Sequence, residues 1–127
     1  MNYLIKAPET LKTEIHLPAS KSISNRVLIL NSLCNYPKKI DNISVCDDTD
    51  VMVKALHDEN HEINIGAAGT AMRFLTAFLS VKKGVWTITG TERMKNRPIK
   101  LLVEALRSLG ARIEYLEKEG FPPLHIK

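Results

Sequence analysis

The feature that most constrains the fold is an alternation of strand-like and helix-like segments that runs through the chain twice. In the first half, residues 13–17 and 40–45 alternate polar and apolar side chains, which is the period of a half-buried strand. Residues 22–34 and the stretch after Asp47 instead carry apolar side chains at helical spacing. The first half therefore predicts strand, helix, strand and helix in that order.

The second half repeats this order from residue 62 onward and adds two strands at its end. Strands are predicted at residues 62–65, 85–89, 111–116 and 124–127, with helices at residues 71–80 and 98–109. Pro98 would take the first helical position, which favours proline, and Gly110 would end that helix. We therefore predict a mixed α/β (α+β) chain made of two units, each of about 50 residues.

The start of the first predicted helix is rich in groups that bind anions. Ser22 can cap the helix, Lys21 supplies a mobile charge, and Arg26 offers a planar fork one turn later. The free N–H groups and the dipole at a helix start also favour negative charge. A plain cap flanked by two solvated basic side chains is the competing interpretation.

A second segment has the same design, with a basic residue beside the start of a helix. Gly69 lies in a turn of small residues that lets the backbone approach a ligand, and Thr70 can cap the helix that follows. Arg73 lies about one turn inside that helix. The glycine spacing fits neither a Walker loop nor a dinucleotide fingerprint.

A third such segment precedes the last helix, where Arg97 stands immediately before Pro98. A cation at this end of a helix is disfavoured by the dipole, and this often marks an anion that both groups bind. Each segment alone could be a turn or a basic loop. Together the three predict one cleft, lined by several helix starts, that gathers more than one anionic group.

Composition narrows the class of ligand. The net charge of +4 and a pI near 9.1 suit an anionic ligand, and would also suit weak contact with nucleic acid. Aromatic residues make up only 6% and do not alternate with basic runs, which argues against a stacking platform for RNA. The separated Cys34 and Cys46 predict reduced structural thiols in a cytoplasmic protein, and no metal-ligand spacing, signal peptide or membrane span is recognisable.

Four motifs resemble those of the 5-enolpyruvylshikimate-3-phosphate synthase family in order and spacing. They occupy residues 20–26, residues 69–73, residues 93–94 with 97–99, and residues 120–124. The resemblance implies a domain of βαβαββ repeats with helices packed inside and sheets outside. It also implies transfer of the enolpyruvyl group of phosphoenolpyruvate to the 5-hydroxyl of shikimate 3-phosphate. This reaction of the shikimate pathway needs no metal or organic cofactor and is the target of glyphosate.

The resemblance also implies roles for individual residues. Those implied to bind shikimate 3-phosphate are Lys21, Ser22 and Arg26, and those implied to bind phosphoenolpyruvate are Lys21, Gly69, Thr70 and Arg97. Two positions depart from the family pattern, because Ala67 stands where asparagine is usual and Phe74 where proline is usual. Partners are expected to be these two small molecules and the second domain, without nucleic acid or membrane.

The family's enzymes are two-domain chains much longer than 127 residues. We therefore expect an N-terminal fragment that lacks the general acid and base groups and is inactive alone. Residues 1–17 would be a strand segment that packs with the missing second domain, and residues 18–127 a partial N-terminal domain. Two alternatives stay open. One is UDP-N-acetylglucosamine enolpyruvyl transferase, which pairs its early lysine with asparagine where this chain has Ser22. The other is a stand-alone phosphate- or RNA-binding module.

Overall fold

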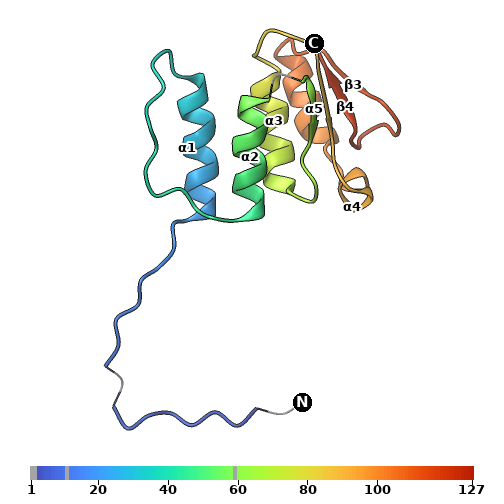
Figure 1. The fold of residues 1–127 in the computed structure, drawn as a ribbon. Coiled ribbons are helices and arrows are strands. Elements are labelled where there is room, and N and C mark those ends of the chain that lie inside the picture. Colours follow the sequence, from blue (N-terminus) through green and yellow to red (C-terminus); the bar gives the residue numbers. More distant parts are fainter. Residues whose placement is uncertain (1–2, 11, 59) are drawn as a thin grey trace.

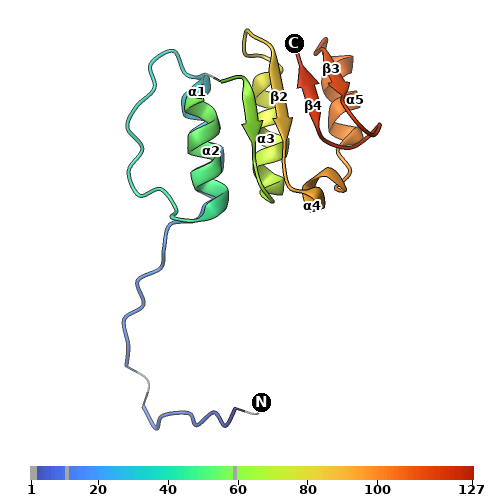
Figure 2. The same cartoon turned by 45° about the vertical axis from the view of Figure 1, so that its right-hand side comes forward.

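The computed structural model describes residues 3–10, 12–58 and 60–127. A four-stranded sheet and the helices behind it make up the body of the chain, and an N-terminal arm extends away from it (Figures 1 and 2). The elements are α1 (Lys21–Leu33), α2 (Asp47–His57), β1 (Glu62–Asn64), α3 (Gly69–Leu79), β2 (Trp86–Thr89), α4 (Glu92–Lys95), α5 (Lys100–Ser108), β3 (Ile113–Tyr115) and β4 (Leu124–Ile126).

The sheet has the strand order β1-β2-β4-β3 and presents one apolar and one polar face. β1 pairs with β2 in parallel, whereas β2 with β4 and β4 with β3 are antiparallel. Ile63 lies opposite Ile88, and both are buried on the face that the helices cover. α3 and α5 lie behind the strands in Figure 2, while the outer face carries Thr87 beside His125. The predicted arrangement, with helices inside and the sheet outside, is confirmed.

α3 is the central helix of the core. Its buried side chains include Met72 and Leu75, which are at most 1% exposed, and it packs against α1, α2 and β2. Met52 from α2 and Val103 from α5 complete the core beside the apolar face of the sheet. Each buried side chain of this size contributes about 1.5–3 kcal/mol to the free energy of folding. Because α3 buries several of them, its packing is a main source of the stability of the body.

The second half of the chain forms one complete βαβαββ unit, as predicted. Two details of that prediction are wrong. The one-turn helix α4 between β2 and α5 was not predicted, and α5 begins at Lys100 rather than at Pro98. Ile99 has a φ of −132°, which is not helical, because its N–H donates to the carbonyl of Gly120 at 2.9 Å. The 120–124 motif thus fixes where α5 begins.

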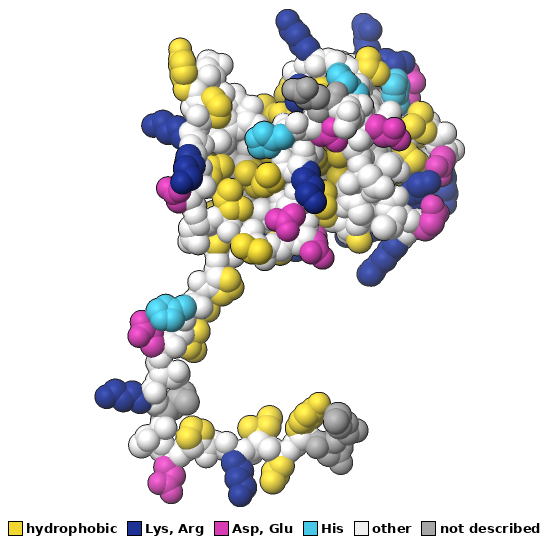
Figure 3. Space-filling model, in the orientation of Figure 1, with side chains coloured by type: hydrophobic (Ala, Val, Ile, Leu, Met, Phe, Trp, Pro, Cys, Tyr) yellow, Lys and Arg dark blue, Asp and Glu magenta, His cyan; other side chains and the backbone are white. Residues whose placement is uncertain are grey.

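The predicted helices of the first half are confirmed, but residues 13–17 and 40–45 form no strand in this structure. The pairing of residues 1–17 with a second domain stays a prediction. Residues 12–17 lie in the exposed arm, where Ile15 is 74% and Leu17 85% exposed; apolar side chains stand out along it in Figure 3. Residues 40–45 lie against α1 instead, where the Ser44 N–H donates to the Ser24 hydroxyl at 2.9 Å. A strand needs the backbone groups of a neighbour, and neither segment has such a neighbour in the described ranges.

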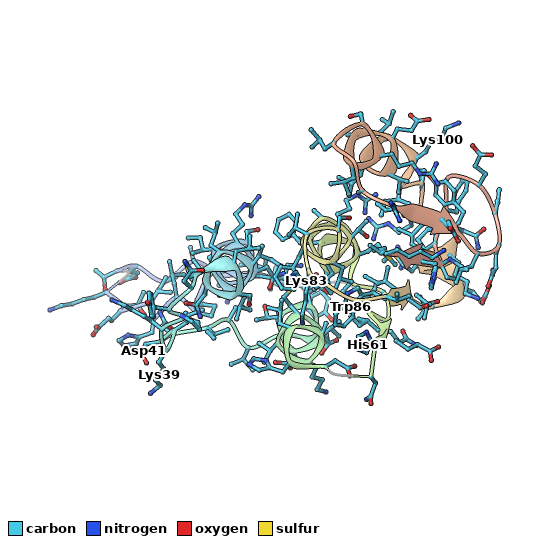
Figure 4. All side chains as sticks on the ribbon, turned by 90° about the horizontal axis from the view of Figure 1, so that it is seen from above. Lys39, Asp41, His61, Lys83, Trp86 and Lys100 are labelled. Carbon is cyan, nitrogen blue, oxygen red and sulfur yellow. The ribbon has the colours of Figure 1, made fainter. Side chains whose placement is uncertain are left out.

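The structure adds three findings that bear on the class of protein. None of the helices in the described ranges is long and apolar enough to cross a membrane. Both cysteine thiols are free, but Cys34 is exposed at the end of α1, so the predicted packing role does not hold for it. The single tryptophan, Trp86, is 3% exposed and stacks on His61 with ring centroids 4.3 Å apart (Figure 4).

Candidate anion-binding site

A pocket of about 350 Å³ opens where the starts of α1 and α3 meet the segment before α5. Its lining residues are Arg26, Gly69, Thr70, Arg73, Phe74 and Arg97. The structure therefore brings together four of the six residues that the sequence marked as site residues. The other two, Lys21 and Ser22, are exposed in the first turn of α1 and do not line the pocket.

The helix start that lines the pocket, that of α3, keeps its positive end uncompensated. Neither α1 nor α3 has an acidic residue in its first turn, whereas the first turn of α2 has three. Because carboxylates near a helix start neutralise its dipole, α3 retains its attraction for an added anion. The pocket thus combines the start of α3 with the guanidinium groups of Arg26 and Arg97.

The caps of these two helices differ from the prediction. α1 begins one residue earlier than expected, so its cap is Ser20, whose hydroxyl accepts from the Ile23 N–H at 3.4 Å, and not Ser22. α3 begins at Gly69 with Ala68 as its cap residue, so Thr70 is the second residue of the helix rather than its cap. Ser22 and Thr70 therefore keep hydroxyls that capping does not occupy.

Gly69 makes room for Arg97. A Cβ atom built on Gly69 would lie 2.7 Å from the central carbon of the Arg97 guanidinium, which is far inside van der Waals contact. Gly69 is buried and its φ is helical, so the space that it leaves explains the glycine, and its backbone angles do not require one. The guanidinium of Arg97 is thereby seated directly on the first residue of α3.

Arg73 links the start of α3 to the segment that precedes α5. Its guanidinium donates to the carbonyl of Gly69 at 3.1 Å and to the carbonyl of Pro98 at 3.0 Å. The fork of an arginine can reach two acceptors at once, which a lysine ammonium does less well. Arg73 therefore holds the start of α3 against the segment that carries Arg97. The sequence spacing placed Arg73 one turn inside the helix, but it did not predict the hydrogen bond from Arg73 to the carbonyl of Pro98.

Arg26 is exposed but held by two contacts. Its Nη1 donates to the carbonyl of Ser22 at 2.9 Å, one turn back along α1. The guanidinium also lies over the ring of Phe74, 5.5 Å from the ring centroid. The remaining N–H donors of the fork are available to a phosphate or carboxylate.

Lys21 forms an ion pair that the sequence analysis did not predict. Its Nζ lies 2.9 Å from the Asp48 carboxylate in the first turn of α2. The hydrogen bond and the charge of Asp48 raise the pKa of Lys21 above its usual value. Asp48 belongs to the acidic run at residues 47–50, and no local spacing links it to Lys21.

Behind this ion pair, a buried polar network joins α1 to α2. The Thr49 hydroxyl donates to Asn25 Oδ1 at 3.0 Å and lies 3.3 Å from the Cys46 sulfur. Asn25 and Thr49 are fully buried, although Asn25 Nδ2 has no hydrogen-bond partner in the described structure. This network sets α2 against α1 and so places Asp48 beside Lys21. Among the described residues, no His, Cys, Asp and Glu side chains gather as a metal site would require.

Known proteins resemble this chain along almost its whole length. The family model for EPSP synthase (3-phosphoshikimate 1-carboxyvinyltransferase) matches residues 5–58 and 57–127. The chain belongs to the EPSP synthase family. A 3-phosphoshikimate 1-carboxyvinyltransferase of Bacteroides fragilis (strain YCH46) is 61% identical over 127 residues, which cover 100% of this chain and 31% of the relative.

More distant relatives agree with this EPSP synthase assignment. The corresponding protein of Cupriavidus taiwanensis is 40% identical over 151 residues, covering 100% of this chain and 35% of the relative. The solved structure of EPSP synthase from Acinetobacter baumannii superposes with a TM-score of 0.80 at 22% identity, over 89% of this chain and 31% of that one. This structural match confirms the fold. The chain spans about a third of the length of these relatives.

Proposed function

We propose that this chain is part of a 3-phosphoshikimate 1-carboxyvinyltransferase. Such an enzyme moves the enolpyruvyl group of phosphoenolpyruvate to the 5-hydroxyl of shikimate 3-phosphate and releases phosphate. The observation that carries the proposal is the pocket where Arg26 and Arg97 meet the start of α3, which has no acidic residue in its first turn. Membership of the EPSP synthase family supports it and favours it over the UDP-N-acetylglucosamine enzyme or a stand-alone binding module.

The shikimate 3-phosphate site would consist of Lys21, Ser22 and Arg26. The fork of Arg26 suits two phosphate or carboxylate oxygens, and the Ser22 hydroxyl can donate a further hydrogen bond. Lys21 would share its ammonium between the substrate and Asp48, which already holds it at 2.9 Å. Asp48 would thus limit the motion of Lys21 before substrate arrives.

The phosphoenolpyruvate site would consist of Lys21, Gly69, Thr70 and Arg97. The closeness of Arg97 to Gly69 puts a positive charge beside the first N–H groups of α3. Groups held in this way need little reorganisation when an anion binds or when charge develops on it. The chain's own residues would therefore bind and orient two anions and need no cofactor to do so.

Proton transfer would come from residues outside this chain, in the part that the longer relatives have in addition. Residues 18–127 would then be part of the N-terminal domain, and residues 1–17 would pack with the second domain. The segment 1–17 includes residues 1, 2 and 11, which lie outside the described residues. We place the enzyme in the cytoplasm, where free thiols such as Cys34 and Cys46 persist.

Titration of the isotope-labelled chain with shikimate 3-phosphate tests this proposal by NMR. We expect amide shifts concentrated at residues 20–26 and 69–73, and much weaker shifts with unphosphorylated shikimate. Lys21→Ala should weaken binding by about tenfold, because a charge-assisted hydrogen bond is lost. Lys39→Ala is the matched control, since Lys39 is exposed and pairs with Asp41 away from the pocket.

Three outcomes would contradict the proposal. One is unchanged affinity in Lys21→Ala, and another is saturable binding of RNA without a response to shikimate 3-phosphate. The third concerns turnover, since the chain alone should release no phosphate from the two substrates together. Measurable release would show that proton-transfer groups are present within these 127 residues.

A further inference from the structure

Phe74 lies on the border between two hollows of different character. On one side is the basic pocket at the starts of α1 and α3. On the other is an apolar groove between the same two helices, lined by side chains that include Ile29, Leu33 and Phe78. Both hollows share just two of their lining residues, Arg26 and Phe74. The side chain of Phe74 therefore has an apolar surrounding on one side and a guanidinium on the other.

The three arginines of the pocket are held in different ways. The guanidinium of Arg73 donates hydrogen bonds to two backbone carbonyls, and that of Arg97 lies directly against Gly69. Arg26 has one hydrogen bond along its own helix and otherwise rests on the Phe74 ring, with its guanidinium carbon 5.5 Å from the centroid. An exposed arginine without such a support samples many rotamers, and ordering them opposes ligand binding.

We propose that Phe74 is a positioning residue for the anion pocket, because its ring holds the Arg26 guanidinium toward the site before an anion arrives. The aromatic face attracts the cation electrostatically and leaves the edge of the guanidinium free to donate hydrogen bonds. A leucine could fill the same apolar space but has no such face. This inference rests on the proposed function only for the identity of the natural anion. The role of Phe74 itself can be tested with inorganic phosphate.

The test compares the unaltered chain with Phe74→Leu and Phe74→Tyr. Phosphate and shikimate 3-phosphate affinities are measured by NMR titration, and the side-chain protons of Arg26 are followed in the same spectra. Protons above an aromatic ring move upfield, so this ring-current shift reports the stacking directly. Phe121→Leu is the matched control, because Lys118 lies 4.3 Å from the Phe121 ring centroid at a site away from the pocket.

We expect Phe74→Leu to abolish the upfield shift of Arg26 and to weaken phosphate binding by about two- to fivefold. Phe74→Tyr should keep both properties, and Phe121→Leu should change neither. A loss of phosphate affinity in Phe74→Tyr equal to that in Phe74→Leu would overturn the proposal, as would full affinity in Phe74→Leu. Absence of phosphate binding to the unaltered chain would overturn it as well.

Failure of the proposed function has a different signature. In that case phosphate binds and depends on Phe74, but shikimate 3-phosphate binds no more tightly than phosphate. Such a result would support the role of Phe74 and remove the named substrate. Phe74→Leu could also lower the thermal midpoint of unfolding, and a loss of affinity would then not be specific to the aromatic ring. In that case Phe74→Tyr and the ring-current shift of Arg26 decide the test, because tyrosine keeps both the volume and the aromatic face of phenylalanine.

Discussion

Gly69 and Gly90 both lack space for a side chain, but different atoms occupy that space. A Cβ atom on Gly69 would meet the end of the flexible Arg97 side chain, whereas one on Gly90 would meet the backbone carbonyl of Gly66 at 2.5 Å. A guanidinium at the end of a long side chain can move aside, but a carbonyl held between β1 and α3 cannot. The first glycine therefore serves the pocket, and the second serves the fold.

Gly69→Ala should weaken binding without harming stability. We expect displacement of Arg97 to lower phosphate affinity by about tenfold, while the free energy of unfolding stays within about 0.5 kcal/mol of its original value. Gly90→Ala should instead lower the free energy of unfolding by about 1–3 kcal/mol, as overpacking does. Phosphate titration and urea unfolding of both variants check this. Equal loss of stability in the two variants would show that the seat of Arg97 is also structural.

Thr49 controls the thiol of Cys46. A hydrogen bond from the Thr49 hydroxyl, and then one from its backbone N–H, lower the pKa of Cys46 below the usual value for a thiol. Since a lower pKa means more thiolate at a given pH, alkylation of Cys46 should begin at lower pH than for an ordinary thiol. The hydroxyl has one proton, so donating it to the thiolate withdraws it from Asn25.

Thr49→Val should raise the pKa of Cys46 and shift its alkylation profile to higher pH. Iodoacetamide labelling as a function of pH, read by mass spectrometry, measures this shift, and Cys34 in the same chain is the internal reference. Thr49→Ser keeps the hydroxyl and should keep the profile. If Thr49→Val leaves the profile in place, the backbone N–H alone accounts for the lowered pKa.

At the level of elements, the position of α3 decides the geometry of the site. Its apolar face packs into the core, its first residue supports Arg97, and Arg73 in its second turn reaches the carbonyl of Pro98. Helix α3 thus links the buried sheet to the exposed pocket. Helix α1 contributes Arg26 from its second turn, and the segment that follows α4 carries Arg97.

Arg73→Lys should loosen the link between α3 and the Arg97 segment. A lysine ammonium cannot reproduce both hydrogen bonds of the fork, so we expect the free energy of unfolding to fall by about 1 kcal/mol and phosphate affinity to fall with it. Arg93→Lys makes the same change at an exposed position and is the control. Chemical denaturation and phosphate titration measure the two effects. An equal response in both variants would contradict the role given to Arg73.

At the scale of the whole molecule, the arm and the body are unequal contributors to stability. Leu4 and Ile5 are 87% and 89% exposed, and Ile15 and Leu17 are exposed as well. Apolar side chains in water contribute no burial energy, which fits a segment that packs with another part of a longer protein. The body from α1 to β4 carries the described core.

Removal of residues 1–17 should leave the stability of the body nearly unchanged. We expect the free energy of urea unfolding to change by less than about 0.5 kcal/mol, because the described apolar side chains of the arm are exposed. Leu75→Ala is the positive control, since Leu75 is 0% exposed and its truncation should cost about 2–5 kcal/mol. A large loss of stability after removal of the arm would show that it packs on the body.

The sequence by itself predicted the order of the elements from residue 62 to residue 127, apart from the one-turn helix α4, and it identified the family. Apolar periodicity identifies a helix or strand whenever its neighbours bury the apolar side chains, as they do for β1, α3 and β2. The same periodicity at residues 13–17 and 40–45 predicted strands that do not form. Alternation of polar and apolar side chains shows which face of a segment could be buried. A strand also needs a neighbouring strand whose backbone groups complete its hydrogen bonds.

Only the tertiary structure decided which charged groups meet. Lys21 and Asp48 are 27 residues apart, and Arg73 and the carbonyl of Pro98 are 25 apart. No local spacing encodes such contacts, because their distances depend on how α3 packs against the sheet and how α2 packs against α1. The sequence supplied basic residues at helix starts, and the packing of the helices converted them into one pocket that holds Arg26 and Arg97 together.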